Sequence, residues 1–203
     1  MNCSIEESLK RVKKIAELAS KHGVKHSGGI AMALGCSYEG KVSPTAVAKL
    51  VERLMEYGCS RIGIGDSIGV GNASSVNALF DELLRVVPAE KITVHFHDTY
   101  GQALTNVLVA IERGVRIAES SVAGLGGGPY AKGATGNLAT ENLVYMLHEL
   151  GFNTGIDLDE MVETGMWICN KVGKPNVSAT ANAMWALKND TRKNELPTTP
   201  FLR

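Results

Sequence analysis

The sequence lacks an excess of charge and any long apolar run, and these absences exclude whole classes of function. Lysine plus arginine and aspartate plus glutamate number 21 each among 203 residues, so the formal net charge is zero. A protein that binds the phosphate backbone of nucleic acids needs a basic field, which this composition does not supply. No stretch approaches the roughly 18 uninterrupted apolar residues of a membrane-spanning helix. We therefore expect neither a nucleic-acid partner nor a membrane span.

Two common sequence motifs are also absent. The four cysteines, Cys3, Cys36, Cys59 and Cys169, show no C-x-x-C spacing, which argues against a zinc ribbon and against a thioredoxin-type redox site. Such scattered cysteines are typical of reduced thiols in an intracellular protein. No G-x-G-x-x-G follows the first expected strand, and the glycines at 63 and 65 fall inside a strand pattern, so dinucleotide binding is disfavoured.

What the sequence does have is a repeated alternation of strand and helix patterns. The first helix is expected to start after Ser4, with Glu7 completing a capping box, and to end near Gly23. Expected strands cover residues 29–34, 61–65, 91–97 and 115–121, and expected helices cover 43–58, 74–87, 102–113 and 137–150. The strand starts lie roughly thirty residues apart, which is the length of a βα unit. Helical spacing resumes at residue 157.

These elements predict an α/β protein with a parallel sheet. Four βα units are compatible with an open doubly wound sheet or with half of a (β/α)8 barrel, which takes about 250 residues when complete. The chain opens on a helix without a preceding strand, which favours a segment of a longer repeat. We expect residues 1–187 to form one domain and residues 188–203 to form a polar tail.

Two histidines end the third expected strand. His95 and His97 are two residues apart, so both imidazoles project from one face at the carboxyl end of the strand, where α/β proteins place their sites. This arrangement suits a pair of metal ligands. The alternative is a pair of core histidines hydrogen-bonded to their neighbours. The remaining histidines, His22, His26 and His148, are expected at the surface.

Polar residues follow other expected strands. Asp66 could bind a metal, orient a ligand or accept a proton, or it could simply cap the following turn. Asn137 would ordinarily cap a helix, with Glu141 in its first turn, although its amide oxygen could instead face the mouth of a barrel. Lys132, in the glycine-rich segment 124–133, could meet an anionic group. Two imidazoles and hard oxygen donors together suit Mg²⁺ or Mn²⁺ in six-fold coordination.

Four segments of the chain resemble 3-hydroxy-3-methylglutaryl-CoA lyases. They are residues 33–40 (Ala-Leu-Gly-Cys-Ser-Tyr-Glu-Gly), 65–71 (Gly-Asp-Ser-Ile-Gly-Val-Gly), 95–103 (His-Phe-His-Asp-Thr-Tyr-Gly-Gln-Ala) and 120–127 (Ser-Ser-Val-Ala-Gly-Leu-Gly-Gly). The resemblance extends over about residues 2–170. It implies a metal-dependent TIM-barrel lyase, of which this chain would contain about the last four βα units and the C-terminal helices.

The resemblance also implies an activity and the residues that carry it. The reaction is cleavage of 3-hydroxy-3-methylglutaryl-CoA to acetyl-CoA and acetoacetate, in leucine degradation and ketone-body formation. His95, His97 and Asn137 would bind the Mg²⁺ or Mn²⁺, and Asp66 and His95 would act in catalysis. An acyl-CoA substrate, a homodimer for the intact family, and a mitochondrial matrix location in eukaryotes or a cytoplasmic one elsewhere are further implications.

The sequence departs from the family pattern in two ways. The family's Arg-Asp pair on the first barrel strand and its Glu on the second have no counterpart among these residues, and Gly128 stands where the family has the cysteine that acts as an acid. We therefore expect the 203-residue chain alone to cleave the substrate slowly. Two other interpretations stay open: a non-catalytic half-barrel that assembles with itself or with a complementary chain, and a related Claisen-type synthase.

Overall fold

The computed structural model describes residues 3–127 and 136–190. These residues form two compact units, one made of residues 3–121, 125–127 and 136–138 and the other of residues 122–124 and 139–190. Within the described ranges, every helix is too short or too polar to cross a lipid bilayer.

The first unit contains a four-stranded sheet and the helices that connect its strands. In chain order its elements are α1 (Ile5–Lys21), β1 (Gly28–Ile30), α2 (Pro44–Glu56), β2 (Ile62–Asp66), α3 (Ala73–Leu83), the 3-10 turn η1 (Ala89–Lys91), β3 (Ile92–Phe96), α4 (Ala103–Glu112) and β4 (Ala118–Glu119). The strands lie in the order β1-β2-β3-β4 and all neighbours are parallel. Sequential parallel strands with helical crossovers form an arc of the kind found in a barrel.

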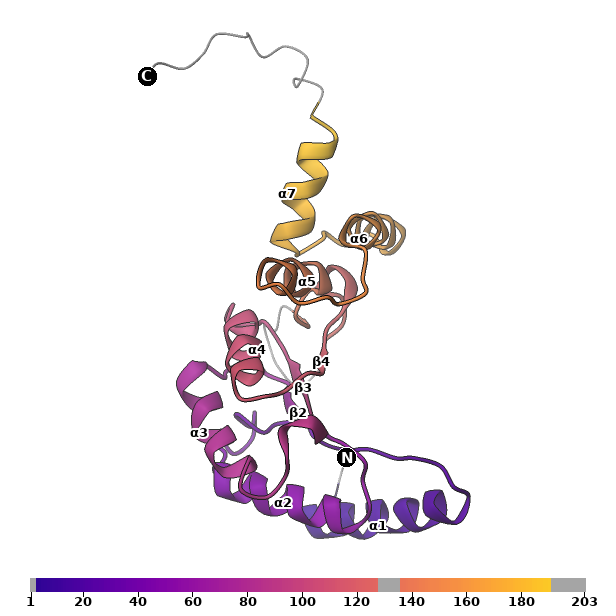
Figure 1. The fold of residues 1–203 in the computed structure, drawn as a ribbon, viewed down its shortest axis with the longest axis vertical. Helices are drawn as coiled ribbons and strands as arrows, with labels where there is room; N and C mark the ends of the chain where they lie inside the picture. The colour runs from indigo at the N-terminus through magenta and orange to yellow at the C-terminus, as the bar shows by residue number, and fades with distance from the viewer. Residues whose placement is uncertain (1–2, 128–135, 191–203) are drawn as a thin grey trace. The chain divides into compact units, whose positions relative to one another are not determined.

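The two faces of the sheet differ in composition because side chains alternate along each strand. The face covered by helices carries Ile62 and Ile64 of β2, both fully buried, and Val94 and Phe96 of β3, each 1% exposed. Helices α2, α3 and α4 succeed one another along this face (Figure 1). The opposite face carries the glycines of β2 and polar side chains of β3, so it is not an apolar core.

Local signals explain where the helices of this unit begin. The Ser4 side chain accepts a hydrogen bond from the Glu7 amide at 3.2 Å, which caps α1. The Glu7 carboxylate instead pairs with Arg11, so only half of the expected capping box forms. A full capping box appears at α3, where the side chains of Asn72 and Ser75 each accept from the other's backbone amide.

Two expected strands are shorter than predicted, for identifiable reasons. The expected strand over 29–34 leaves the regular ladder after Ile30, where the Ala31 carbonyl accepts from both the amide and the hydroxyl of Ser67. The strand expected over 115–121 is reduced to Ala118–Glu119. The Val115 amide donates back to α4, and the Arg116 guanidinium donates to the Ile111 carbonyl of α4 and to the Val115 carbonyl. This segment therefore completes the helix end before it enters the sheet.

The second unit is helical. It contains the 3-10 turn η2 (Val122–Gly124), α5 (Thr140–Glu149), α6 (Leu158–Val172) and α7 (Ala179–Lys188). Asp157 and Ser178 cap α6 and α7 with their side chains. Helix α5 begins after Ala139 as its N-cap, so the interpretation of Asn137 as a helix cap is wrong. Of the expected polar tail, residues 191–203 lie outside the described residues.

A buried carboxylate organises this second unit. Glu141 is fully buried and both of its oxygens accept from the Ala123 amide, at 2.9 and 3.0 Å. Ala123 has a φ of 56°, in the left-handed region that costs a residue with a Cβ. A Cβ at Gly165 of α6 would lie 2.3 Å from the Glu141 Oε1, so only glycine allows this approach. Burial raises the pKa of Glu141, and the bonds from backbone amides oppose that rise.

Candidate functional site

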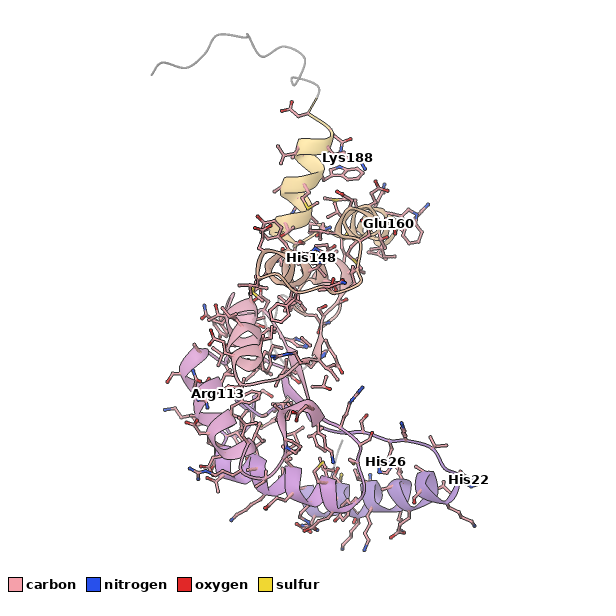
Figure 2. All side chains as sticks on the ribbon, in the orientation of Figure 1. His22, His26, Arg113, His148, Glu160 and Lys188 are labelled. Carbon is pink, nitrogen blue, oxygen red and sulfur yellow. The ribbon has the colours of Figure 1, made fainter. Side chains whose placement is uncertain are left out.

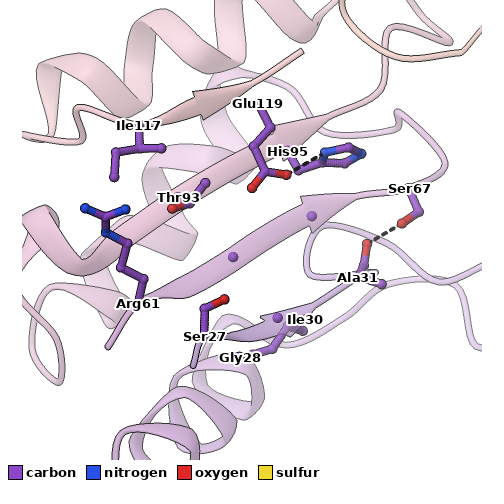
Figure 3. A pocket seen from close by; sticks show the side chains of 13 residues that line it. Ser27, Gly28, Ile30, Ala31, Arg61, Ser67, Thr93, His95, Ile117 and Glu119 are labelled. Carbon is purple, nitrogen blue, oxygen red and sulfur yellow. Dashed lines mark hydrogen bonds and ion pairs between the residues drawn. The ribbon is translucent and has the colours of Figure 1, made fainter. Parts of the chain in front are cut away.

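A pocket of about 650 Å³ lies on the open face of the sheet (Figure 3). All four strands contribute to its lining, among them Gly63 and Gly65 of β2, Thr93 and His95 of β3, and Glu119 of β4. A Cβ at position 65 would lie 2.7 Å from a backbone carbonyl oxygen of the segment after β1, so the close approach of these two segments requires glycine. The pocket is therefore bounded by backbone, by polar side chains and by the apolar side chains of Ile30 and Ile117.

The two expected histidines meet at the carboxyl end of β3. His95 lies within the strand and His97 directly follows it, and their ring centroids are 5.4 Å apart. The His95 side chain is 38% exposed, whereas His97 is only 7% exposed. The structure thus brings the two imidazoles together, with one facing the pocket and the other enclosed.

Asn137 lies beside them because the segment 136–138 pairs with the end of β3. His97 and Asn137 form an antiparallel bridge, and the Leu138 amide donates to the Phe96 carbonyl at 3.2 Å. The Asn137 amide nitrogen donates to the Leu125 carbonyl at 2.9 Å, which fixes the side-chain orientation. All three expected metal ligands therefore gather at one edge of the sheet.

Two atoms at this edge are buried without a hydrogen-bond partner among the described residues, namely the His97 Nδ1 and the Asn137 Oδ1. Leaving a buried polar atom unsatisfied costs about 1–3 kcal/mol. Both atoms are of types that coordinate divalent cations. Burial and the neighbouring His95 lower the pKa of His97, which favours the neutral imidazole that metal binding requires. The donor set fits a divalent ion.

The described residues do not supply a complete coordination shell. Nowhere in residues 3–127 or 136–190 do three or more histidine, cysteine or carboxylate side chains gather in a metal-binding arrangement. An ion held by two imidazoles and an amide oxygen would need further oxygen ligands to reach the six that Mg²⁺ and Mn²⁺ prefer.

The side chain of Asp66 is hydrogen-bonded to backbone amides of the loop that follows β2. It is fully buried, and its two oxygens accept from the Val70 amide at 3.2 Å and the Gly71 amide at 2.8 Å. Burial raises the pKa of Asp66, while the backbone amides and His97 act in the opposite direction. Of the two roles considered, the geometry displays the cap of the turn after β2. A catalytic role for Asp66 stays a prediction.

The sequence did not identify two further polar residues that the structure shows to be hydrogen-bonded near these side chains. Asn106, fully buried on α4, donates to the Gly71 carbonyl at 3.0 Å and so braces the loop that Asp66 caps. Glu119 places its Oε2 3.0 Å from the His95 Nδ1 (Figure 3). A signal for Glu119 exists in the parallel register, which puts residue 119 opposite residue 95, but only once the strand pairing is known.

The other three histidines are not part of this edge. His22 is exposed at the end of α1, and the nearby half-buried His26 contacts the Tyr57 carbonyl at 3.3 Å (Figure 2). His148 contacts the Thr154 hydroxyl at 2.9 Å. None of these arrangements resembles a metal site.

Comparison with known proteins decides the family. The model of the HMGL-like family matches residues 1–168. The chain belongs to the HMGL-like family. It is 48% identical over 183 residues to "3-hydroxy-3-methylglutaryl-CoA lyase, cytoplasmic" of Danio rerio, a match that covers 90% of this chain and 55% of that protein.

Solved structures of HMGL-like proteins share the fold. The crystal structure of hydroxymethylglutaryl-CoA lyase from Pseudomonas aeruginosa matches with a TM-score of 0.88 and 45% identity, covering 92% of this chain and 62% of that one. A lyase described as from "Acenitobacter baumannii", in complex with coenzyme A and 3-methylmalate, matches with a TM-score of 0.84 and 34% identity, covering 98% and 63%. The predicted resemblance and the α/β fold, as part of a TIM barrel, are confirmed.

The chain spans about half the length of the curated HMGL-like relatives it matches, 55% for the Danio rerio protein. Curated relatives bear names that place them in the cytoplasm or in mitochondria. Two residues singled out in the sequence, Gly128 and Lys132, lie outside the described residues.

Proposed function

We propose that this chain carries the metal-binding part of a carbon-carbon lyase that cleaves 3-hydroxy-3-methylglutaryl-CoA into acetyl-CoA and acetoacetate. His95, His97 and Asn137 would hold Mg²⁺ or Mn²⁺. The observation that carries the proposal is the pair of buried atoms without partners among the described residues, His97 Nδ1 and Asn137 Oδ1, at the edge where the sequence places the ligands. A purely structural His97 would have a hydrogen-bonded Nδ1 instead.

When bound, the ion would lower the pKa of a coordinated substrate hydroxyl, so that a base can remove its proton. The chain's own residues prepare that chemistry. His97 is enclosed and burial lowers its pKa, which favours the neutral ring. Asn137 is oriented by its bond to the Leu125 carbonyl, and Asp66 holds the loop after β2. His95 lines the pocket on the open face of the sheet. The resemblance assigns catalytic roles to His95 and Asp66.

The relatives support the proposed substrate class. One HMGL-like lyase has been solved in complex with coenzyme A and 3-methylmalate, which are a thiol carrier of acyl groups and a branched hydroxy acid. We extend an acyl-CoA substrate to the present chain, and with it a role in leucine degradation and ketone-body formation. A homodimer, and a mitochondrial location if the source is eukaryotic or a cytoplasmic one otherwise, belong to the same proposal.

Acetoacetate release from 3-hydroxy-3-methylglutaryl-CoA tests the proposal. The 203-residue chain with Mn²⁺ is expected to react at least about 10²-fold more slowly than an intact relative. The reason is that the absence of a general acid or of an oxyanion donor each lowers the rate by about that factor. Adding Gly128→Cys and a separately expressed N-terminal half of a relative should restore turnover.

The outcomes separate the competing interpretations. Near-normal turnover by the unmodified chain would mean that the reaction does not need a cysteine in place of Gly128. Absence of turnover even in the complemented Gly128→Cys protein would contradict the lyase assignment and favour a non-catalytic half-barrel. Condensation of acetyl-CoA with a 2-oxo acid by the complemented protein would identify a Claisen-type synthase instead.

A further inference from the structure

The exposed member of the histidine pair has a carboxylate partner on the neighbouring strand. His95 of β3 and Glu119 of β4 are direct register partners in the parallel sheet. The His95 Nδ1 and the Glu119 Oε2 are 3.0 Å apart, and both side chains line the pocket on the open face of the sheet (Figure 3).

This contact selects one form of the imidazole. A carboxylate accepts a hydrogen bond, so in the neutral ring the Nδ1 of His95 carries the proton and the lone pair resides on Nε2. Ligand histidines in metalloproteins commonly donate their second ring nitrogen to such a carboxylate, which fixes the tautomer and the ring orientation. The Nε2 of His95 is thereby left available to bind an ion.

The two histidines need different means of orientation. His97 is 7% exposed and is enclosed by its surroundings. The His95 side chain is 38% exposed, so packing alone leaves its ring freer to turn. The Glu119 side chain, 58% exposed, adds little to folding stability in such a solvated pair. Its effect should therefore be seen at the metal site.

We propose that Glu119 is a positioning residue, which holds the His95 ring in the Nδ1-protonated tautomer and directs its Nε2 toward the divalent ion. The inference rests on the proposed metal site. Glu119 acts through His95 and is not itself assigned as a ligand.

The tautomer of His95 in the metal-free chain gives a direct test. Long-range ¹H–¹⁵N NMR at about pH 8 should show His95 protonated at Nδ1 in the native chain. Glu119→Ala should shift His95 toward the Nε2-protonated form, whereas Glu119→Gln, whose amide oxygen still accepts, should retain most of the Nδ1 form. An unchanged tautomer in Glu119→Ala would overturn the proposal.

Mn²⁺ affinity, measured by proton relaxation titration, supplies the second readout. Glu119→Ala should weaken binding about 10-fold to 100-fold, with a smaller loss for Glu119→Gln. Glu112→Ala, which removes an exposed carboxylate from α4, is the matched control for net charge and should bind as the native chain does. Folding is checked by circular dichroism for all variants.

The results distinguish failure of this inference from failure of the proposed function. Native-like Mn²⁺ affinity in Glu119→Ala would overturn the positioning role and leave the metal site intact. Equal, complete loss of Mn²⁺ in both Glu119 variants, with the tautomer retained in Glu119→Gln, would make Glu119 a ligand and overturn its assignment as a positioning residue. A native chain that takes up no Mn²⁺ would remove the metal site, and the positioning role with it.

Discussion

Asp66 is buried with both carboxylate oxygens bonded to backbone amides, so its first effect is on the loop after β2. Asparagine in its place keeps a single acceptor oxygen, and either the Val70 or the Gly71 amide then loses its partner. We expect Asp66→Asn to lower the free energy of unfolding by about 1–3 kcal/mol, the cost of an unsatisfied buried group. Urea denaturation followed by circular dichroism measures this change.

Asp81→Asn is a suitable control for that substitution. Asp81 is 57% exposed in an ion pair with Arg113, and such pairs contribute no more than about 1 kcal/mol. Equal stabilities for Asp66→Asn and the native chain would mean that the amide bonds do not hold the loop. In that case a role for Asp66 confined to the substrate site would be the better account.

For single residues, the sequence predicted the positions of side chains that depend only on near neighbours in the chain. His95 and His97 are two residues apart on a strand, and period-two alternation was enough to place both rings at one end. Of the two interpretations of Asn137, the helix cap was wrong, because its neighbour in the fold, His97, is forty residues away in the chain. Glu119 and Asn106 were missed for the same reason, since their partners lie on other elements.

The contact between α5 and α6 depends on one glycine, Gly165 of α6, which lies against Glu141 of α5. A methyl group at Gly165 would lie 2.3 Å from the Glu141 Oε1 and 3.0 Å from the Asn176 Nδ2. Overpacking of this kind costs about 1–3 kcal/mol, so Gly165→Ala should lower the thermal and urea midpoints even though alanine favours helix. Circular dichroism at increasing urea concentration records the loss.

A double-mutant cycle isolates the contact with Glu141. Glu141→Ala removes the carboxylate that the new methyl group would strike, so the double variant should be less destabilised than the sum of the single variants, by about 0.5–3 kcal/mol. Additive effects would show that Gly165 is required for another reason. A more stable Gly165→Ala chain would show that the helices separate easily at this point.

Element types followed from hydrophobic periodicity, whereas strand lengths did not. Every expected strand exists, but β1 and β4 are shorter than their apolar runs. The run around Val115 is apolar because it packs beneath the end of α4, where its amide is bonded. An apolar run indicates that a segment is buried. It does not indicate whether the buried segment is a strand or the end of a helix.

For the whole molecule, the sequence-based fold class is correct because repeated βα spacing leaves few parallel arrangements. The sheet order β1-β2-β3-β4 and the matching HMGL-like relatives agree on part of a TIM barrel. Division of the described residues into two compact units was not foreseen, and the expected single domain over 1–187 stays a prediction. Local periodicity does not record which helices pack together.

The central claim is that the edge formed by His95, His97 and Asn137 binds a divalent ion. Paramagnetic broadening of the NMR signals by Mn²⁺ tests it most directly, because the effect is local and detects weak binding. Substoichiometric Mn²⁺ should erase the signals of these three residues and spare His22, which follows α1. His97→Ala should abolish the broadening without altering the circular dichroism, and His148→Ala should leave it unchanged. Broadening that is absent, centred on other residues, or undiminished in His97→Ala would contradict the account.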